Sequence, residues 1–283
     1  MSVSAFSDIG KLANDLFSKD YPLGVTKLEA KTVAQNGVTF TATGAQDSKT
    51  GIVQGELKTK YSDAKNGLTL TESWTTSNVL TGQVEVENKI APGVKLDATA
   101  SFLPATGSKN AKLGIFYKAP AVHSRVFADL FRGPTLTADA VVARNGLLAG
   151  VEVAYDVHEA KITRYNTAVG YSTPEYTLTL HANNNLNLFS ASYYHRVNTQ
   201  VEAGGRAVWD AKSNAAVALE VGTKYTLDKD AFVKAKVNNN GIFGLSYTQA
   251  VRKGVKLTIA GSVDTARLSE NAHKLGLSIV LDA

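Results

Sequence analysis

The stretch GELKTKYSDAKNGLTLTESW, residues 55–74, sets the pattern that most of the chain repeats. Polar and apolar side chains alternate on both sides of Asn66-Gly67, a pair that favours a tight turn between two antiparallel strands. A period of two residues indicates strands with one apolar and one polar face. Glu72 breaks the alternation, because its carboxylate lies in the apolar register between Leu70 and Trp74.

The same alternation continues from Val25 to Ala283, in segments of about ten residues bounded by Gly, Pro and Asn turn signals. We expect nineteen strands, at residues 25–34, 37–46, 51–62, 67–75, 80–89, 93–103, 109–119, 122–131, 135–144, 147–157, 161–172, 176–184, 186–197, 199–210, 214–227, 231–239, 241–251, 254–266 and 273–283.

Three features favour a membrane barrel over a soluble all-β fold. The segments exceed the usual strand of about five or six residues and match the roughly 9–11 of a tilted membrane-spanning strand. Several turns are very short, and the polar face is too charged for a core. A barrel of about nineteen strands is too wide to fill with side chains, so its charged face lines a wet lumen and its apolar face meets lipid. We therefore predict an all-β membrane protein, a transmembrane β-barrel.

Residues 5–21, AFSDIGKLANDLFSKDY, predict one amphipathic helix, with Ser7 as N-cap and Pro22 after its end. It either lies on the membrane surface or sits in the lumen with its apolar stripe on the wall. The chain is expected to divide into helix and hinge at 1–24 and a single barrel domain at 25–283. The stripe consists of Ile9, Leu12, Ala13, Leu16 and Phe17.

Composition excludes several functions. The 283 residues include no cysteine, and the net charge of +5 is too small and dispersed to indicate nucleic-acid binding. The sequence contains no catalytic motif and no metal-ligand spacing. It therefore predicts no enzymatic activity, no cofactor and no metal.

Strand parity assigns fifteen bases and nine acids to the lumen. An excess of basic side chains favours anions. Selectivity is expected to be weak, because salt screens charges over about 8 Å in a wide pore. The bases expected to set selectivity are Lys31, Lys58, Lys60, Lys95, Lys112, Lys234, Lys236 and Lys256.

The stretch YTLDKDAFVKAKVNNNGIFGLSY, residues 225–247, closely resembles the signature of the eukaryotic porins, apart from Lys229, where that family usually has proline or a small residue. The segments AFSDIGKLANDLFSKDY, GLTLTESWTTSNVL and HKLGLSIVLDA resemble the N-terminal helix, fourth strand and last strand of the voltage-dependent anion channels. FLPATGSK and SASYYHRVNTQVEAG look fungal. The resemblance implies a weakly anion-selective, voltage-dependent channel of the mitochondrial outer membrane that passes ATP, ADP, phosphate and other small metabolites.

Particular residues acquire roles from this resemblance. It favours the lumen for the helix and makes Lys11, Lys19 and Lys95 candidate nucleotide contacts, although Asn14 replaces a third family base. The glycine-rich hinge of the family is thinned here to residues 21–24. A sorting signal read by the outer-membrane assembly machinery would comprise Lys274, Gly276, Ile279 and Leu281.

The lipid-facing Glu72 has two interpretations. Some relatives carry glutamate at this position, where it is tied to partner binding and self-association. The alternative is an acid that the bilayer tolerates by local thinning. Two other functions also remain open for the chain: a protein-import β-barrel pore of the same superfamily, and a lipid-handling or interaction scaffold.

We predict that Lys60→Glu and Lys95→Glu each shift the reversal potential towards cations, because each reverses a charge assigned to the lumen. The measurement is the zero-current voltage across a planar bilayer in a salt gradient. An unchanged value for both variants would contradict the parity assignment.

Overall fold

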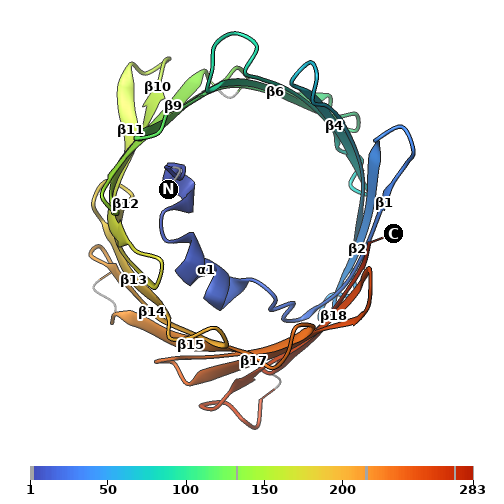
Figure 1. The fold of residues 1–283 in the computed structure, drawn as a ribbon, viewed down its shortest axis with the longest axis vertical. Coiled ribbons are helices and arrows are strands. Elements are labelled where there is room, and N and C mark those ends of the chain that lie inside the picture. The colour runs from blue at the N-terminus through green and yellow to red at the C-terminus, as the bar shows by residue number, and fades with distance from the viewer. Residues whose placement is uncertain (1–2, 132, 214–215, 271, 283) are drawn as a thin grey trace.

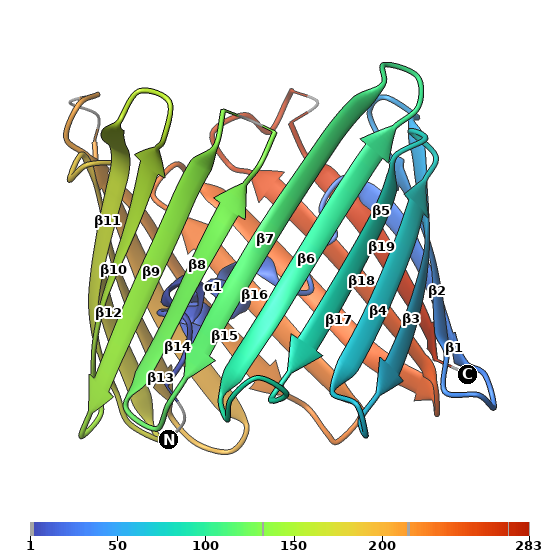
Figure 2. The same ribbon diagram turned by 90° about the horizontal axis from the view of Figure 1, so that it is seen from above.

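The computed structural model describes residues 3–131, 133–213, 216–270 and 272–282, and nineteen strands among them form one closed sheet (Figure 1). The strands slant across the barrel wall (Figure 2). The predicted all-β barrel is confirmed. The strands are β1 (Val25–Val33), β2 (Thr39–Asp47), β3 (Val53–Asp63), β4 (Leu68–Thr75), β5 (Leu80–Glu87), β6 (Val94–Leu103), β7 (Ser108–Lys118), β8 (Val122–Asp129), β9 (Thr135–Arg144), β10 (Leu147–Asp156), β11 (Lys161–Ser172), β12 (Tyr176–Asn183), β13 (Leu188–Arg196), β14 (Val201–Asp210), β15 (Ala218–Thr226), β16 (Ala231–Asn238), β17 (Ile242–Arg252), β18 (Val255–Asp264) and β19 (Lys274–Asp282).

Turn chemistry explains where strand boundaries differ from the predicted ranges. β2 begins two residues late, because Gly37 adopts a φ of 82° in the preceding turn. β3 also begins late, because the Asp47 carboxylate accepts hydrogen bonds from the backbone N–H groups of Lys49 and Thr50. The predicted start of the fifteenth strand at 214–215 lies outside the described residues.

The first and last strands close the barrel as a parallel pair, with Thr26 opposite Leu277 and Lys31 opposite Asp282. The consecutive strands pair antiparallel, as β1 does with β2 and β18 with β19. Because direction reverses at each hairpin, an odd number of strands leaves the first and the last running the same way. The sequence analysis did not predict this parallel seam.

The N-terminal segment, residues 3–24, lies inside the lumen and follows the wall (Figure 1). It contains a 3₁₀ turn η1 (Phe6–Asp8) and a helix α1 (Lys11–Ser18), separated at Gly10, whose φ is 78°. Among the described residues, no helix is long and apolar enough to span a bilayer.

The predicted continuous helix capped by Ser7 is therefore wrong, because Gly10 in the left-handed region breaks it. Gly10 lies so close to the wall that an added Cβ would be 2.9 Å from Thr179 Oγ1. The break allows two apolar contacts with a curved wall: Ile9 packs with Val141, and Phe17 packs with Tyr194. Leu12, assigned to the apolar stripe, is instead 48% exposed.

The two faces of the wall differ as the alternation predicts. The strands that touch the N-terminal segment show which of their side chains point into the lumen. Directly opposed residues of neighbouring strands share a face, so the strand register identifies the inward-facing side chains around the whole barrel. The outer face presents a continuous set of exposed apolar side chains, which marks a lipid-contacting surface. Its exposed aromatic residues include Tyr61, Trp74, Tyr117, Tyr155, Tyr171, Trp209 and Tyr225.

Candidate functional site

The candidate site is the lumen, whose inner wall has two unlike halves. The N-terminal segment covers one half: η1 contacts β9 and β10, and α1 contacts β13, β14 and β15. Lysines of β16 and β18 bind the last turn of α1 and the linker that follows it, residues 19–24. The half formed by β2 to β7 lies away from α1 and faces open lumen (Figure 1).

Lys234 is the central contact of the covered half. Its ammonium group donates to the carbonyl oxygens of Asp15 at 3.0 Å and Lys19 at 2.8 Å, and pairs with the Asp20 carboxylate at 3.2 Å. The Asp15 carbonyl also accepts the backbone N–H of Lys19, whereas the Lys19 carbonyl lies at the end of α1, where backbone acceptors lack helical partners. A lysine of the barrel therefore caps a helix distant in sequence, and the negative end of the helix dipole favours its charge.

Lys236 and Arg206 extend this attachment. Lys236 donates to the Phe17 carbonyl oxygen at 2.6 Å and pairs with Glu220 at 3.3 Å. Arg206 donates to the Asn14 side-chain oxygen at 3.4 Å, and its guanidinium lies 5.4 Å from the centre of the Phe17 ring. The Asn14 side chain thus accepts a hydrogen bond from the wall.

Asp20 joins the linker to two strands. It pairs with Lys234 and, at 3.2 Å, with Lys256, while Ser246 donates to its backbone carbonyl oxygen. Burial raises the pKa of Asp20, but the ammonium groups of Lys234 and Lys256 outweigh burial and hold it below the ordinary 3.8. Asp20 is therefore ionised throughout the physiological range.

Glycines make room for this segment. Gly222 lies under Phe17, and an added Cβ would be 3.0 Å from its ring. A Cβ added at Gly204 would lie at the same distance from Leu16 Cδ2. At Gly276 an added Cβ would fall on the Pro22 carbonyl oxygen, so this position of the expected sorting signal also has a packing reason to be glycine.

The open half carries bases without acidic partners. Lys58 and Lys60 are exposed on the inner face of β3, opposite Thr41 and Thr39 of β2. In the described ranges, no carboxylate lies within 4.0 Å of either ammonium group. Lys112, on the same half, lies 4.3 Å from the centre of the Phe127 ring.

Two other predicted selectivity residues, Lys31 of β1 and Lys95 of β6, are paired. Lys31 lies 3.7 Å from Asp282 across the seam, and Lys95 pairs with Glu85. The structure does not bring the three candidate nucleotide contacts together. Lys11 and Lys19 lie on the N-terminal segment, whereas Lys95 lies on β6 in the open half (Figure 1).

The sequence analysis missed several lumen charges. Asp139 is almost fully buried and pairs with Arg125 at 2.9 Å, and Glu152 pairs with Arg164 at 3.5 Å. Together with Asp282 and the acids of the N-terminal segment they reduce the expected excess of bases. A regular count of alternate positions along β9 and β10 would have found Asp139 and Glu152, whereas a bulge between β10 and β11 shifts the count near Arg164.

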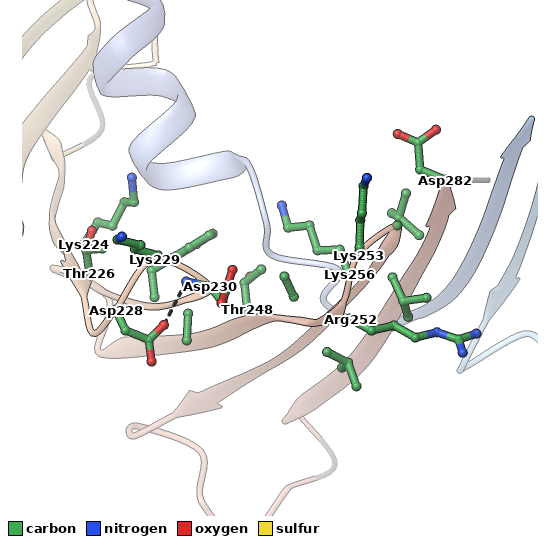
Figure 3. Close-up of a pocket in the computed structure, with 17 residues that line it drawn as sticks. Lys224, Thr226, Asp228, Lys229, Asp230, Thr248, Arg252, Lys253, Lys256 and Asp282 are labelled. Atoms are coloured by element: carbon green, nitrogen blue, oxygen red, sulfur yellow. Dashed lines mark hydrogen bonds between the residues drawn. The ribbon is translucent and has the colours of Figure 1, made fainter. Parts of the chain in front are cut away.

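One end of the barrel holds a cavity of about 740 Å³ between the β15–β16 and β17–β18 turns (Figure 3). Lys224 and Lys229 lie on one side, and Lys253 and Lys256 on the other, with Arg252 extending away. Lys224 is already paired with Glu202 at 3.0 Å, and Asp228 and Asp230 line the same cavity. Its opposing charges largely balance, so the cavity adds little net charge to the lumen.

The remaining predicted residues lie on β4 and β19. Glu72 is exposed and lies opposite Thr59 and Gly82, on the face away from the lumen. Lys274 and Gly276 share the inner face of β19, opposite Ser262 and Ala260, whereas Ile279 and Leu281 face outward.

An apolar exterior around a charged, open lumen defines the class of membrane β-barrels that enclose an aqueous passage. Residues 3–276 match the family model described as eukaryotic porin, and the chain belongs to that family.

Named relatives span the whole chain. It is 44% identical over 284 residues to "Mitochondrial outer membrane protein porin" of Neurospora crassa, covering 100% of both chains. It is 39% identical over 280 residues to "Non-selective voltage-gated ion channel VDAC2" of Meleagris gallopavo, covering 99% of this chain and 94% of the other. A solved mutant of the Rh. blastica porin matches with a TM-score of 0.51 at 9% identity, over 91% of this chain and 96% of the other, which shows likeness of fold alone.

We predict that Asp20→Asn loosens the N-terminal segment at neutral pH, because Lys234 and Lys256 lose their shared carboxylate. A spin label at Ser18→Cys, in a chain without other cysteines, reports the change as a more mobile spectrum. Asp15→Asn is the matched control, since its side chain pairs only with exposed Lys11, at 3.8 Å.

The pH dependence has a defined direction. A carboxylate with a lowered pKa in the folded state contributes stability above its ordinary pKa and loses it as pH falls through the lowered value. The label on the unaltered segment should therefore stay immobile from neutral pH down to about 5 and become mobile only below the ordinary 3.8. Equal spectra for Asp20→Asn and the control at neutral pH would contradict the attachment described above.

Proposed function

We propose that this chain is a voltage-dependent, weakly anion-selective channel of the mitochondrial outer membrane, with ATP, ADP, phosphate and other small metabolites as its permeants. The observation that carries the proposal is the charged, open lumen with Lys58 and Lys60 exposed on its open half. The printed names of the full-length relatives, a mitochondrial outer membrane porin and a voltage-gated ion channel, support location and activity.

The lumen width supports metabolite passage. Nineteen strands about 4.8 Å apart and tilted near 40° give a backbone diameter of about 38 Å. The N-terminal segment and the lining side chains narrow this opening, which still admits a nucleotide and excludes a folded protein. Lys11, Lys19 and Lys95 remain proposed nucleotide contacts, acting one after another along the passage because they do not converge.

Two rival functions are less well supported. A protein-import pore for basic presequences needs an acid-rich lumen, whereas the fifteen bases that strand parity assigns to this lumen exceed its nine assigned acids and the three that parity missed, Asp139, Glu152 and Asp282. A lipid-handling or interaction scaffold does not explain why the lumen is charged. We further propose that lipids surround the apolar exterior and that the assembly machinery reads Lys274, Gly276, Ile279 and Leu281 on the last strand.

Reconstitution in a planar bilayer tests the channel function. The expected result is a large conductance that favours chloride over potassium slightly and falls at high voltage of either polarity. ATP added to one chamber should appear in the other. A sealed membrane, or a conductance that rejects ATP, would contradict the proposal.

Glu72 carries a separate proposal, that it supports association between barrels. An acid on a barrel exterior is unfavourable, although it costs less than the roughly 2–4 kcal/mol of a midplane Lys or Arg. Packing of this face against a second barrel would remove Glu72 from lipid.

We predict that Glu72→Gln stabilises the barrel, leaves conductance nearly unchanged and weakens pH-dependent association. Crosslinking in liposomes at pH 5 and pH 8 measures that association. If the original chain and the variant crosslink alike at both values, Glu72 is only an acid that the bilayer tolerates.

A further inference from the structure

Three lysines of the wall direct their ammonium groups at the N-terminal segment, and Lys256 alone of the three is still 43% exposed. Lys234 and Lys236 lie on β16, and Lys256 lies on β18. Their partners in the segment are the Asp20 carboxylate and the carbonyl oxygens of Asp15, Phe17 and Lys19.

The oxygen atoms of the segment occupy positions that an anion would otherwise take. An ammonium group binds phosphate or chloride through the same N–H donors that it directs here at carbonyl and carboxylate oxygens. The side chain of Lys234 is only 5% exposed and that of Lys236 only 20%. A permeating anion therefore cannot contact the charge of Lys234 while the segment is in place.

Lys58 and Lys60 provide the contrast within the same lumen. They occupy inner-face positions on β3 by the same alternation, but they are exposed, whereas Lys234 is almost fully buried under the segment. Permeating ions meet their ammonium groups directly. Equal charges on the two halves of the wall should thus contribute unequally to selectivity.

We propose that the N-terminal segment masks an anion-binding pair formed by Lys234 and Lys236, with the half-exposed Lys256 at its edge. Lys234 sets selectivity only when the segment leaves the wall, and a lumen whose segment is released prefers anions more strongly. This proposal rests on the channel function proposed above, and its ligand class is small inorganic anions and organic phosphates.

The test is a comparison of one substitution in two full-length backgrounds. The attached background is the original chain. The released background carries Leu16→Ser, Phe17→Ser and Asp20→Asn, which remove the apolar contacts of α1 with Tyr194 and the ion pairs of Asp20 without altering any strand. A spin label at Ser18→Cys verifies release in the folded barrel. Gly222→Val provides a second route to release, because its Cβ would press on the Phe17 ring.

Lys234→Gln and the matched control Lys58→Gln are then introduced into each background, and reversal potentials are measured in a potassium chloride gradient. In the attached background, Lys234→Gln should shift the potential towards cations by at most about one third of the Lys58→Gln shift, because its charge is shielded from permeating ions. In the released background the two shifts should be about equal. Release of the segment alone should move the reversal potential in the direction of stronger anion selectivity.

The outcomes separate this inference from the channel function. A conducting barrel in which Lys58→Gln shifts the potential, but Lys234→Gln shifts it equally in both backgrounds, overturns the mask and leaves the channel intact. A verified release that moves the potential towards cations also overturns it. If the original chain does not conduct at all, the channel proposal itself fails.

Discussion

Backbone hydrogen bonding without water is the constraint on which the rest of this structure depends. Within a bilayer an unpaired N–H or C=O costs several kcal/mol, so a sheet can cross only if it has no free edges. Here the β1–β19 seam removes the last two edges. The alternation follows from closure, because each strand of a closed sheet presents one face to lipid and the other to the lumen. A polar inner face on a barrel this wide then requires water, and water makes room for an N-terminal segment inside.

The N-terminal segment depends on two kinds of contact that act at different places. Apolar residues such as Ile9 and Phe17 fix its position along the curved wall, and glycines beneath them allow close approach. Lysines of the wall then satisfy the carbonyl groups of Phe17 and Lys19, at the end of α1, which the helix itself leaves unpaired. The same lysines that capture the helix are withdrawn from the aqueous passage. Attachment and lumen charge are therefore coupled.

The sequence predicted the fold in detail and the lumen only in part. A period of two and strong turn signals are local properties, so the nineteen strands and the facing of residues such as Lys58 could be read directly. The break at Gly10 could not be predicted, because it depends on close packing against Thr179 and its neighbours, which are distant in sequence. The bonds from Lys234 to the N-terminal segment could not be predicted either. Strand parity gives the face on which a side chain lies, but not what covers it. Asp139 and Glu152 were overlooked although the local pattern contained them.

The parallel seam also bears on how the barrel forms. Its contacts join residues 26–31 to residues 277–282, so they close a loop of almost the entire chain, whereas each hairpin joins near neighbours. Closing so long a loop costs the most conformational entropy of any pairing in the sheet, and non-local contacts of this kind form slowly. Hairpins can therefore accumulate early, while the open sheet retains two reactive edges until the final strand arrives. Completion of β19 is the step that converts an aggregation-prone ribbon into a sealed cylinder.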